Sequence, residues 1–120
     1  MKCCDIKTSS LTEHILVERR TQTRDTLGGL VDVWTADPPE GVFAQIKPLS
    51  GTEAYVAHRI APRANYHAIL RYRADENGAP YYTPADRVVW RGRYFDLLSS
   101  IDIESESRWL QLFLVEGAPS

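Results

Sequence analysis

The sequence predicts a small domain built mainly of β-strands. Its apolar residues occur in short stretches that end at glycine, proline or asparagine, a pattern typical of strands and not of long helices. At 120 residues, the chain has room for one domain with its own hydrophobic core. Six or seven short strands, one short helix and frequent turns favour a small barrel or a sandwich. The predicted strands are residues 14–24, 30–35, 42–49, 65–73, 87–90, 93–98 and 109–115.

A clear turn separates the first two strands. Ile15 and Val17 alternate with other residues, so we expect both side chains on the buried face of the first strand. Residues 25–29, which include two consecutive glycines, form the turn. The second strand ends before residues 37–41, because Pro38 and Pro39 have no backbone N–H to offer a strand ladder.

The third strand leads into a long connection that contains a short helix. Pro48 indicates the end of that strand or a position at a sheet edge. Ser50 and Glu53 have the spacing of a capping box, in which the two side chains satisfy backbone N–H groups at a helix start. The helix would cover residues 54–58 and end before Pro62. Connections of this length in small domains are usually functional or partly disordered.

The second half of the chain contains the clearest hairpin. Residues 75–78 predict a turn after the fourth strand. Arg91 and Gly92 form a tight turn between the next two strands, and weak strand character continues to residue 104. The last strand is apolar on both faces, so we expect it to be central or covered on both sides.

The chain has no arrangement of residues typical of an enzyme or a metal site. His14, His58 and His67 lack the spacing of zinc ligands, and the adjacent Cys3 and Cys4 have no second cysteine pair. The sequence contains neither a nucleophile elbow nor a phosphate-binding glycine loop. We therefore predict no catalytic activity, no metal and no cofactor.

Composition narrows the range of partners. A net charge of −2 argues against a dedicated nucleic-acid-binding domain. No stretch approaches the roughly 18 apolar residues that a membrane helix needs, and the polar start of the chain does not resemble a signal peptide. We expect no membrane contact and synthesis in a reducing cytoplasm.

Charge is unevenly distributed along the sequence. Seven arginines lie between residues 59 and 93, whereas five acidic residues lie after residue 93. Such a separation fits head-to-tail contact between copies of the chain, which closes into a ring when the rotation permits. The alternative is that folding mixes the two groups of charges in space.

Several segments, taken together in their order, carry a family resemblance. The strongest is V-F-A-Q-I-K-P-L-S-G-T-E (residues 42–53), a strand that ends in Ser-Gly-x-Glu. The others are residues 15–25, 31–34, 69–73 and 87–101, followed by the leucine-rich last strand. In this order and spacing, the chain resembles the phage head–tail joining family, the head-closure or stopper proteins of long-tailed bacteriophages and phage-like particles.

That resemblance implies a small β-barrel of six or seven strands with one short helix in a long inter-strand loop. It also implies a homo-oligomeric ring, dodecameric in the family, in the neck of the virion. The ring would join the portal or adaptor complex to the tail terminator or tail tube, and residues 50–65 would face the channel. There they would help to retain DNA, which passes without sequence recognition. The candidate residues for this channel loop or for contacts between subunits are Ser50, Gly51, Glu53, His58, Arg59 and Arg63.

Three alternatives stay open at this level. Arg59 and Arg63 either line the channel or contact a neighbouring subunit. The chain could instead be another neck or tail ring subunit, or a stand-alone nucleic-acid module of the OB or SH3 type, which needs stacking aromatics on a basic face. We expect a single domain over residues 14–116, with a flexible segment before it (residues 1–13) and a frayed tail after it (residues 117–120). We also expect the isolated chain to be monomeric or weakly associated.

Overall fold

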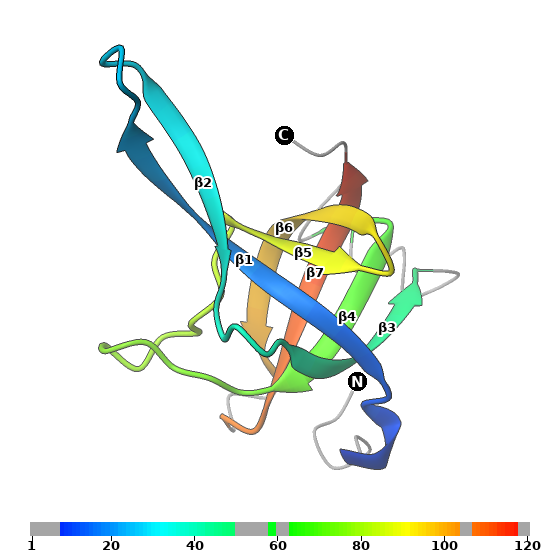
Figure 1. The fold of residues 1–120 in the computed structure, drawn as a ribbon. Helices are drawn as coiled ribbons and strands as arrows, with labels where there is room; N and C mark the ends of the chain where they lie inside the picture. The colour runs from blue at the N-terminus through cyan, green and yellow to red at the C-terminus, as the bar shows by residue number, and fades with distance from the viewer. Residues whose placement is uncertain (1–7, 50–57, 60–62, 104–106, 118–120) are drawn as a thin grey trace.

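Strands account for most of the residues that the structure describes (Figure 1). The computed structural model describes residues 8–49, 58–59, 63–103 and 107–117. A short 3-10 helix near the N-terminus precedes strands that all pair antiparallel. The elements are η2 (Thr8–Ser10), β1 (Glu13–Arg24), β2 (Leu30–Ala36), β3 (Val42–Pro48), β4 (Tyr66–Arg71), β5 (Asp86–Trp90), β6 (Arg93–Asp102) and β7 (Trp109–Gly117).

Six of these strands close into a ring of backbone pairings. Their order is β1-β3-β4-β7-β6-β5, and β5 pairs again with β1, so the sheet closes on itself. β2 lies outside this ring and pairs with β1. The predicted mainly β fold with a small six- to seven-stranded barrel is confirmed.

β1 pairs with three different strands along its length. Residues 13–15 pair with β3, residues 16–19 with β5, and residues 18–24 with β2. Beyond Arg19, β1 and β2 therefore leave the barrel as a two-stranded ribbon, which we call the arm (residues 20–34; Figure 1). With the arm, the molecule extends 52 Å in its longest direction, against 29 and 26 Å in the other two.

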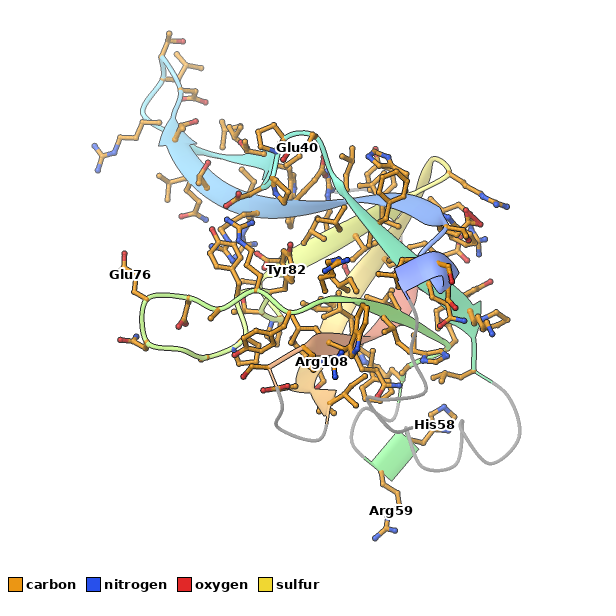
Figure 2. The ribbon with its side chains drawn as sticks, turned by 90° about the horizontal axis from the view of Figure 1, so that it is seen from below. Glu40, His58, Arg59, Glu76, Tyr82 and Arg108 are labelled. Atoms are coloured by element: carbon orange, nitrogen blue, oxygen red, sulfur yellow. The ribbon has the colours of Figure 1, made fainter. Side chains whose placement is uncertain are left out.

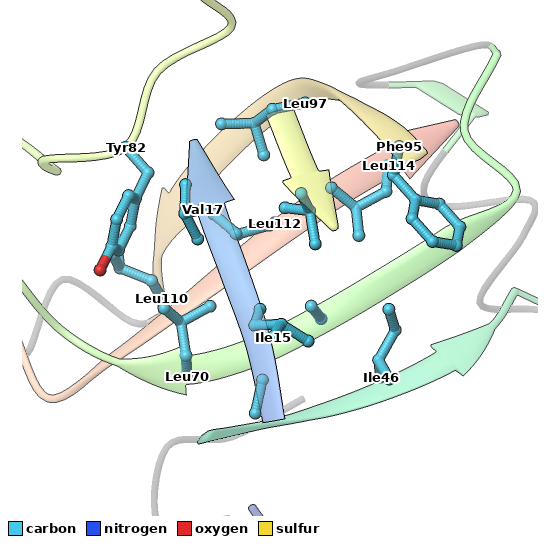
Figure 3. Close-up of a cluster of buried hydrophobic side chains, with 13 residues drawn as sticks. Ile15, Val17, Ile46, Leu70, Tyr82, Phe95, Leu97, Leu110, Leu112 and Leu114 are labelled. Atoms are coloured by element: carbon cyan, nitrogen blue, oxygen red, sulfur yellow. The ribbon is translucent and has the colours of Figure 1, made fainter. Parts of the chain in front are cut away.

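Side chains from alternate strand positions fill the barrel (Figure 3). Ile15 and Val17 are 0% and 2% exposed, as their alternation predicts. Phe95 is fully buried and contacts the half-buried Tyr66 edge-on, with the ring centroids 5.2 Å apart. This core consists of Ile15, Val17, Ala44, Ile46, Ala68, Leu70, Tyr82, Val88, Phe95, Leu97, Leu110, Leu112 and Leu114.

β7 is covered on both faces, which explains its nearly continuous apolar sequence. Three leucines of β7, at alternate positions, point into the barrel core. On the outer face, Trp109 packs with Leu11 of the N-terminal segment, and Phe113 packs with Ala64. The prediction of a doubly covered last strand is confirmed, and the cover comes from segments outside the barrel strands.

Strand ends differ from the predicted ones by a few residues. β4 ends at Arg71 and not at Arg73, because Tyr72 and Arg73 bond to Arg108 and Tyr81 in the loops that follow. β6 continues through Asp102 after an irregularity between Leu97 and Ser99. The predicted capping box lies outside the described residues, whereas His58 is helical, in line with the predicted short helix.

Candidate interaction surfaces

Two arginine–carboxylate pairs fix the root of the arm to the barrel. Asp86, whose side chain is 1% exposed, accepts hydrogen bonds from Arg19 Nε at 3.1 Å and Nη2 at 3.2 Å. Arg87 donates to Glu18 at 2.7 Å, and its guanidinium lies 4.1 Å from the ring of Trp34. Since both pairs join β1 to β5, the barrel sets the direction in which the arm leaves.

A second cluster ties the end of β2 to the loop between β4 and β5. The guanidinium groups of Arg19 and Arg73 lie 4.3 and 3.8 Å from the centroid of the Tyr81 ring, within the range of cation–π contact. Its hydroxyl donates to the carboxylate of Asp37, which also pairs with Arg73 at 3.3 Å. The hydrogen bond from Tyr81 lowers the pKa of Asp37, and the same bond raises the pKa of Tyr81.

Beyond this root, the arm is exposed on both faces. Every residue from Arg20 to Val33 is exposed. The carboxylate of Asp25 orders the turn at the tip, because it accepts hydrogen bonds from the N–H groups of Leu27 and Gly29 at 2.9 and 2.8 Å. The tip nevertheless presents Leu27 at 94% exposure, which makes it a candidate contact surface.

The connection between β3 and β4 is closed at its base. The backbone N–H of Leu49 donates to the carbonyl of Asn65 at 3.0 Å, and the N–H of Asn65 donates to Leu114 at 2.9 Å. Ala64 is buried against Phe113, and the ring nitrogen Nε2 of His58 lies 2.9 Å from the carbonyl oxygen of Ala64. The last residues of the connection are thus held against the outer face of β7.

Of the six residues proposed for the channel loop, the structure describes His58, Arg59 and Arg63; Ser50, Gly51 and Glu53 lie outside its described ranges. Arg59 is exposed and points away from the barrel in Figure 2. Arg63 lies on the rim of an open hollow of about 500 Å³, whose lining also includes Arg20 and Asp96. Within the described ranges, neither Arg59 nor Arg63 forms an ion pair.

Folding pairs four of the seven arginines of the middle segment with carboxylates of the same chain: Arg73, Arg87, Arg91 and Arg93. Arg93 bonds twice to Glu116 at the end of β7, at 2.6 and 2.8 Å, and these hydrogen bonds lower the pKa of Glu116. Arg91 likewise pairs with Glu13 in β1. These four arginines are therefore neutralised within their own chain, and one of their partners, Glu116, belongs to the acidic group that follows residue 93.

The remaining candidate residues have structural roles. His67 is buried and its Nδ1 lies 3.1 Å from Gln111 Nε2. Most of the aromatics considered for base stacking pack in or against the core: Tyr66, Tyr72, Tyr81, Tyr82 and Trp90. Over the described ranges, no three His, Cys, Asp or Glu side chains come together, and no helix is long and apolar enough to cross a membrane.

Sequence reasoning did not find the arm. It predicted both strands and the turn between them, but not that half of this hairpin would leave the barrel. The available signal was the end of the apolar alternation after Val17, followed by six polar residues at positions 19–24 and exposed Leu27 and Leu30. A polar strand of this kind has no face to bury against the core.

The described residues form a small closed β scaffold with a protruding arm, and a long connection joins β3 to β4. Comparison with known proteins adds the family. The family model for phage head completion protein matches residues 6–117, and the chain belongs to this family. Membership assigns it a structural role in completing a phage head, at the head–tail region.

Solved structures show the same fold. The solution structure of protein SF1141 from Shigella flexneri 2a matches with a TM-score of 0.72 and 19% identity, over 96% of this chain and all of that one. A chain from the virion of a native gene transfer agent particle matches with a TM-score of 0.58 and 22% identity, over 91% of this chain and 97% of that one. No curated protein matches in sequence.

Proposed function

We propose that the chain is a head-closure or stopper subunit, which forms a ring between the portal or adaptor complex and the tail terminator or tail tube. In this role the chain is not an enzyme and needs no cofactor. It sits in the neck of the virion after assembly in the host cytoplasm, provides the surface to which the tail docks, and helps to retain packaged DNA.

The observation that carries the proposal is the connection between β3 and β4. Its two ends are joined by the hydrogen bond from Leu49 to Asn65, so the connection begins and ends at one place on the barrel. Arg59 and Arg63 are exposed on it without an ion pair in the described part of the chain. Arginine contacts to phosphate position DNA without reading its sequence.

The small number of such arginines fits a channel through which DNA must move. Each phosphate contact strengthens binding through counterion release, so a loop with many cations would hold DNA too firmly for ejection. With two arginines per subunit around a ring, many weak contacts retain the DNA together, and no single contact is strong. Arg63 and Arg20 also line the same open hollow, a position equally suited to contact a neighbouring subunit.

Co-purification with the two neighbours tests the proposal and separates it from another neck or tail ring. The tagged chain is expected to retain both the adaptor and the tail terminator of its own particle, each in the absence of the other. A tail-tube or terminator subunit would instead retain only tail proteins, and that result would refute the stopper role. Tight binding of short DNA with steep salt dependence would favour the nucleic-acid module.

A further inference from the structure

Exposed large apolar side chains gather on two surfaces. Among the described residues, four such side chains lie on the arm, and the fifth, Phe43, is 59% exposed at the start of β3. Phe43 lines an open, apolar hollow of about 290 Å³, which we call the hollow of β3 (Leu11, Val42, Phe43, Leu70 and Arg71). An apolar cavity of about 150 Å³ is enough to hold a benzene molecule, so the hollow of β3 has room for a leucine side chain.

The two surfaces cannot cover each other within one molecule. Phe43 pairs with His14 at the start of β1, whereas Leu30 pairs with Arg24 at its end. Ten residues of extended strand separate His14 from Arg24, a distance of about 33 Å. The tip of the arm therefore points away from β3 of its own chain (Figure 1).

The charges beside the two surfaces are complementary. Arg24 lies opposite Leu30 on the arm, is exposed, and forms no ion pair in the described part of the chain. Glu40 is also exposed without an ion pair there, and its carbonyl oxygen lies 2.7 Å from Nε2 of His14, whose ring contacts Phe43 at 5.4 Å between centroids. The arm thus carries leucines near an arginine without an ion pair, and Glu40, whose backbone contacts His14 beside Phe43, carries a carboxylate without one in the described part of the chain.

We propose that the arm of one copy docks in the hollow of β3 of the next copy, with Leu27 and Leu30 entering the hollow and Arg24 meeting Glu40. The contact is head-to-tail, because each copy offers an arm on one side and a hollow on the other. This inference rests on the proposed function in one respect: it names the contact that joins neighbouring subunits of the ring.

The contact between two copies is weak and gains strength in the ring. It buries two leucines and one exposed ion pair, far less area than a stable dimer needs. Two isolated chains therefore meet only at high protein concentration. When a neck partner holds the subunits side by side, each arm finds its hollow at a high effective concentration.

Mixing two variants that complement each other tests the contact. Leu27→Asp combined with Leu30→Asp makes the arm tip polar and leaves the hollow unchanged. Phe43→Asp makes the hollow polar and leaves the arm unchanged. In sedimentation at high concentration, the wild-type chain is expected to form open chains or rings, each variant alone to stay monomeric, and their equimolar mixture to stop at a dimer. We expect each variant to weaken self-association by about 10-fold or more.

Charge reversal adds a test that does not depend on the apolar residues. Arg24→Glu alone and Glu40→Arg alone are expected to weaken self-association by about 2- to 5-fold, the range for an exposed pair. Both changes in one chain are expected to restore self-association, because the two charges of the contact are then exchanged and still attract each other. Glu76→Lys, at the exposed turn after β4, is the matched control and leaves association unchanged.

Three outcomes would overturn the proposal: a wild-type chain that stays monomeric at every concentration, a mixture that forms no dimer, or reversed charges that fail to restore association. Association of chains that begin at Thr8, but not of full chains, would also refute it, since residues 1–7 would then occupy the hollow. These measurements use the pure chain alone. Their failure would leave the neck role intact, because co-purification with the adaptor and tail terminator tests that role separately.

Discussion

The barrel and the arm share one strand, yet they are stabilised differently. In the first half of β1, Ile15 and Val17 are buried in the core, and the strand pairs first with β3 and then with β5. In its second half, residues 20–24 are exposed and pair with β2 alone. Two-stranded ribbons are marginal in water without a sheet or partner to support them. The barrel therefore contributes most of the stability, and the arm stays exposed and available for contact.

The largest difference is expected for truncation in the core. Phe95→Ala removes a fully buried aromatic ring from the centre of the barrel and is expected to lower the free energy of unfolding by about 3–5 kcal/mol. Leu30→Ala on the arm is the control and is expected to change the free energy of unfolding by less than about 0.5 kcal/mol. Urea unfolding of both variants measures the difference, and equal losses would show that the arm is part of the cooperative core.

The root of the arm is expected to give an intermediate effect. Asp86→Ala removes a buried carboxylate that accepts bonds from Arg19 and from the backbone N–H of Thr83. Arg19 is about one-third exposed and regains water, so we expect a loss of about 2 kcal/mol and not the full cost of a buried charge. Amide hydrogen exchange should also become faster in β2. Unchanged exchange there would show that this pair does not hold the arm.

The Asp37–Tyr81 bond predicts a pH dependence. The pKa of Asp37 is lowered in the folded chain, so its contribution to stability is present above the ordinary carboxyl pKa of about 4 and is lost as pH falls through the lowered value. Asp37→Asn is expected to reduce stability at pH 7 by less than about 1 kcal/mol, because the pair is partly exposed. The difference from wild type should vanish in strong acid. A constant difference at all pH values would contradict this account.

The smallest effect is expected at the tip. Asp25→Ala removes the acceptor that orders the turn through the N–H groups of Leu27 and Gly29. Global stability should stay within about 0.5 kcal/mol, because the tip opens independently of the barrel. Hydrogen exchange at Leu30 and Val31 should become faster. A clear drop in the midpoint of global unfolding would instead mean that the arm and the barrel unfold together.

Sequence predicted the barrel well because its strands follow simple rules. Alternation placed Ile15 and Val17 in the core, and the Arg91-Gly92 turn has positive φ at both residues, as a two-residue hairpin requires. The polar residues after Val17 indicate a hairpin with no buried face, but the point at which it leaves the barrel depends on where β5 stops pairing with β1. The pairing of Arg93 with Glu116 also depends on which strands become neighbours, and charge order along the chain does not reveal it.

We expect the barrel to tolerate a shorter β3–β4 connection. Removing residues 53–63 leaves residues 50–52 and Ala64 between Leu49 and Asn65, whose backbones are already joined at 3.0 Å. Four residues suffice for a hairpin loop. The arm can likewise be trimmed by replacing residues 22–32 with Asn-Gly between Thr21 and Val33, which face each other. Both trimmed chains are expected to unfold at close to the wild-type temperature.

Particle assembly with these two chains tests the account most directly. In particles that lack the wild-type protein, the wild-type chain should restore DNA-filled heads joined to tails, counted by electron microscopy and by packaged DNA. The chain with the shortened connection should give particles that leak DNA or lack tails, and the chain with the trimmed arm should give incomplete necks. Full rescue by both trimmed chains would contradict the account, because the barrel alone would then complete the head.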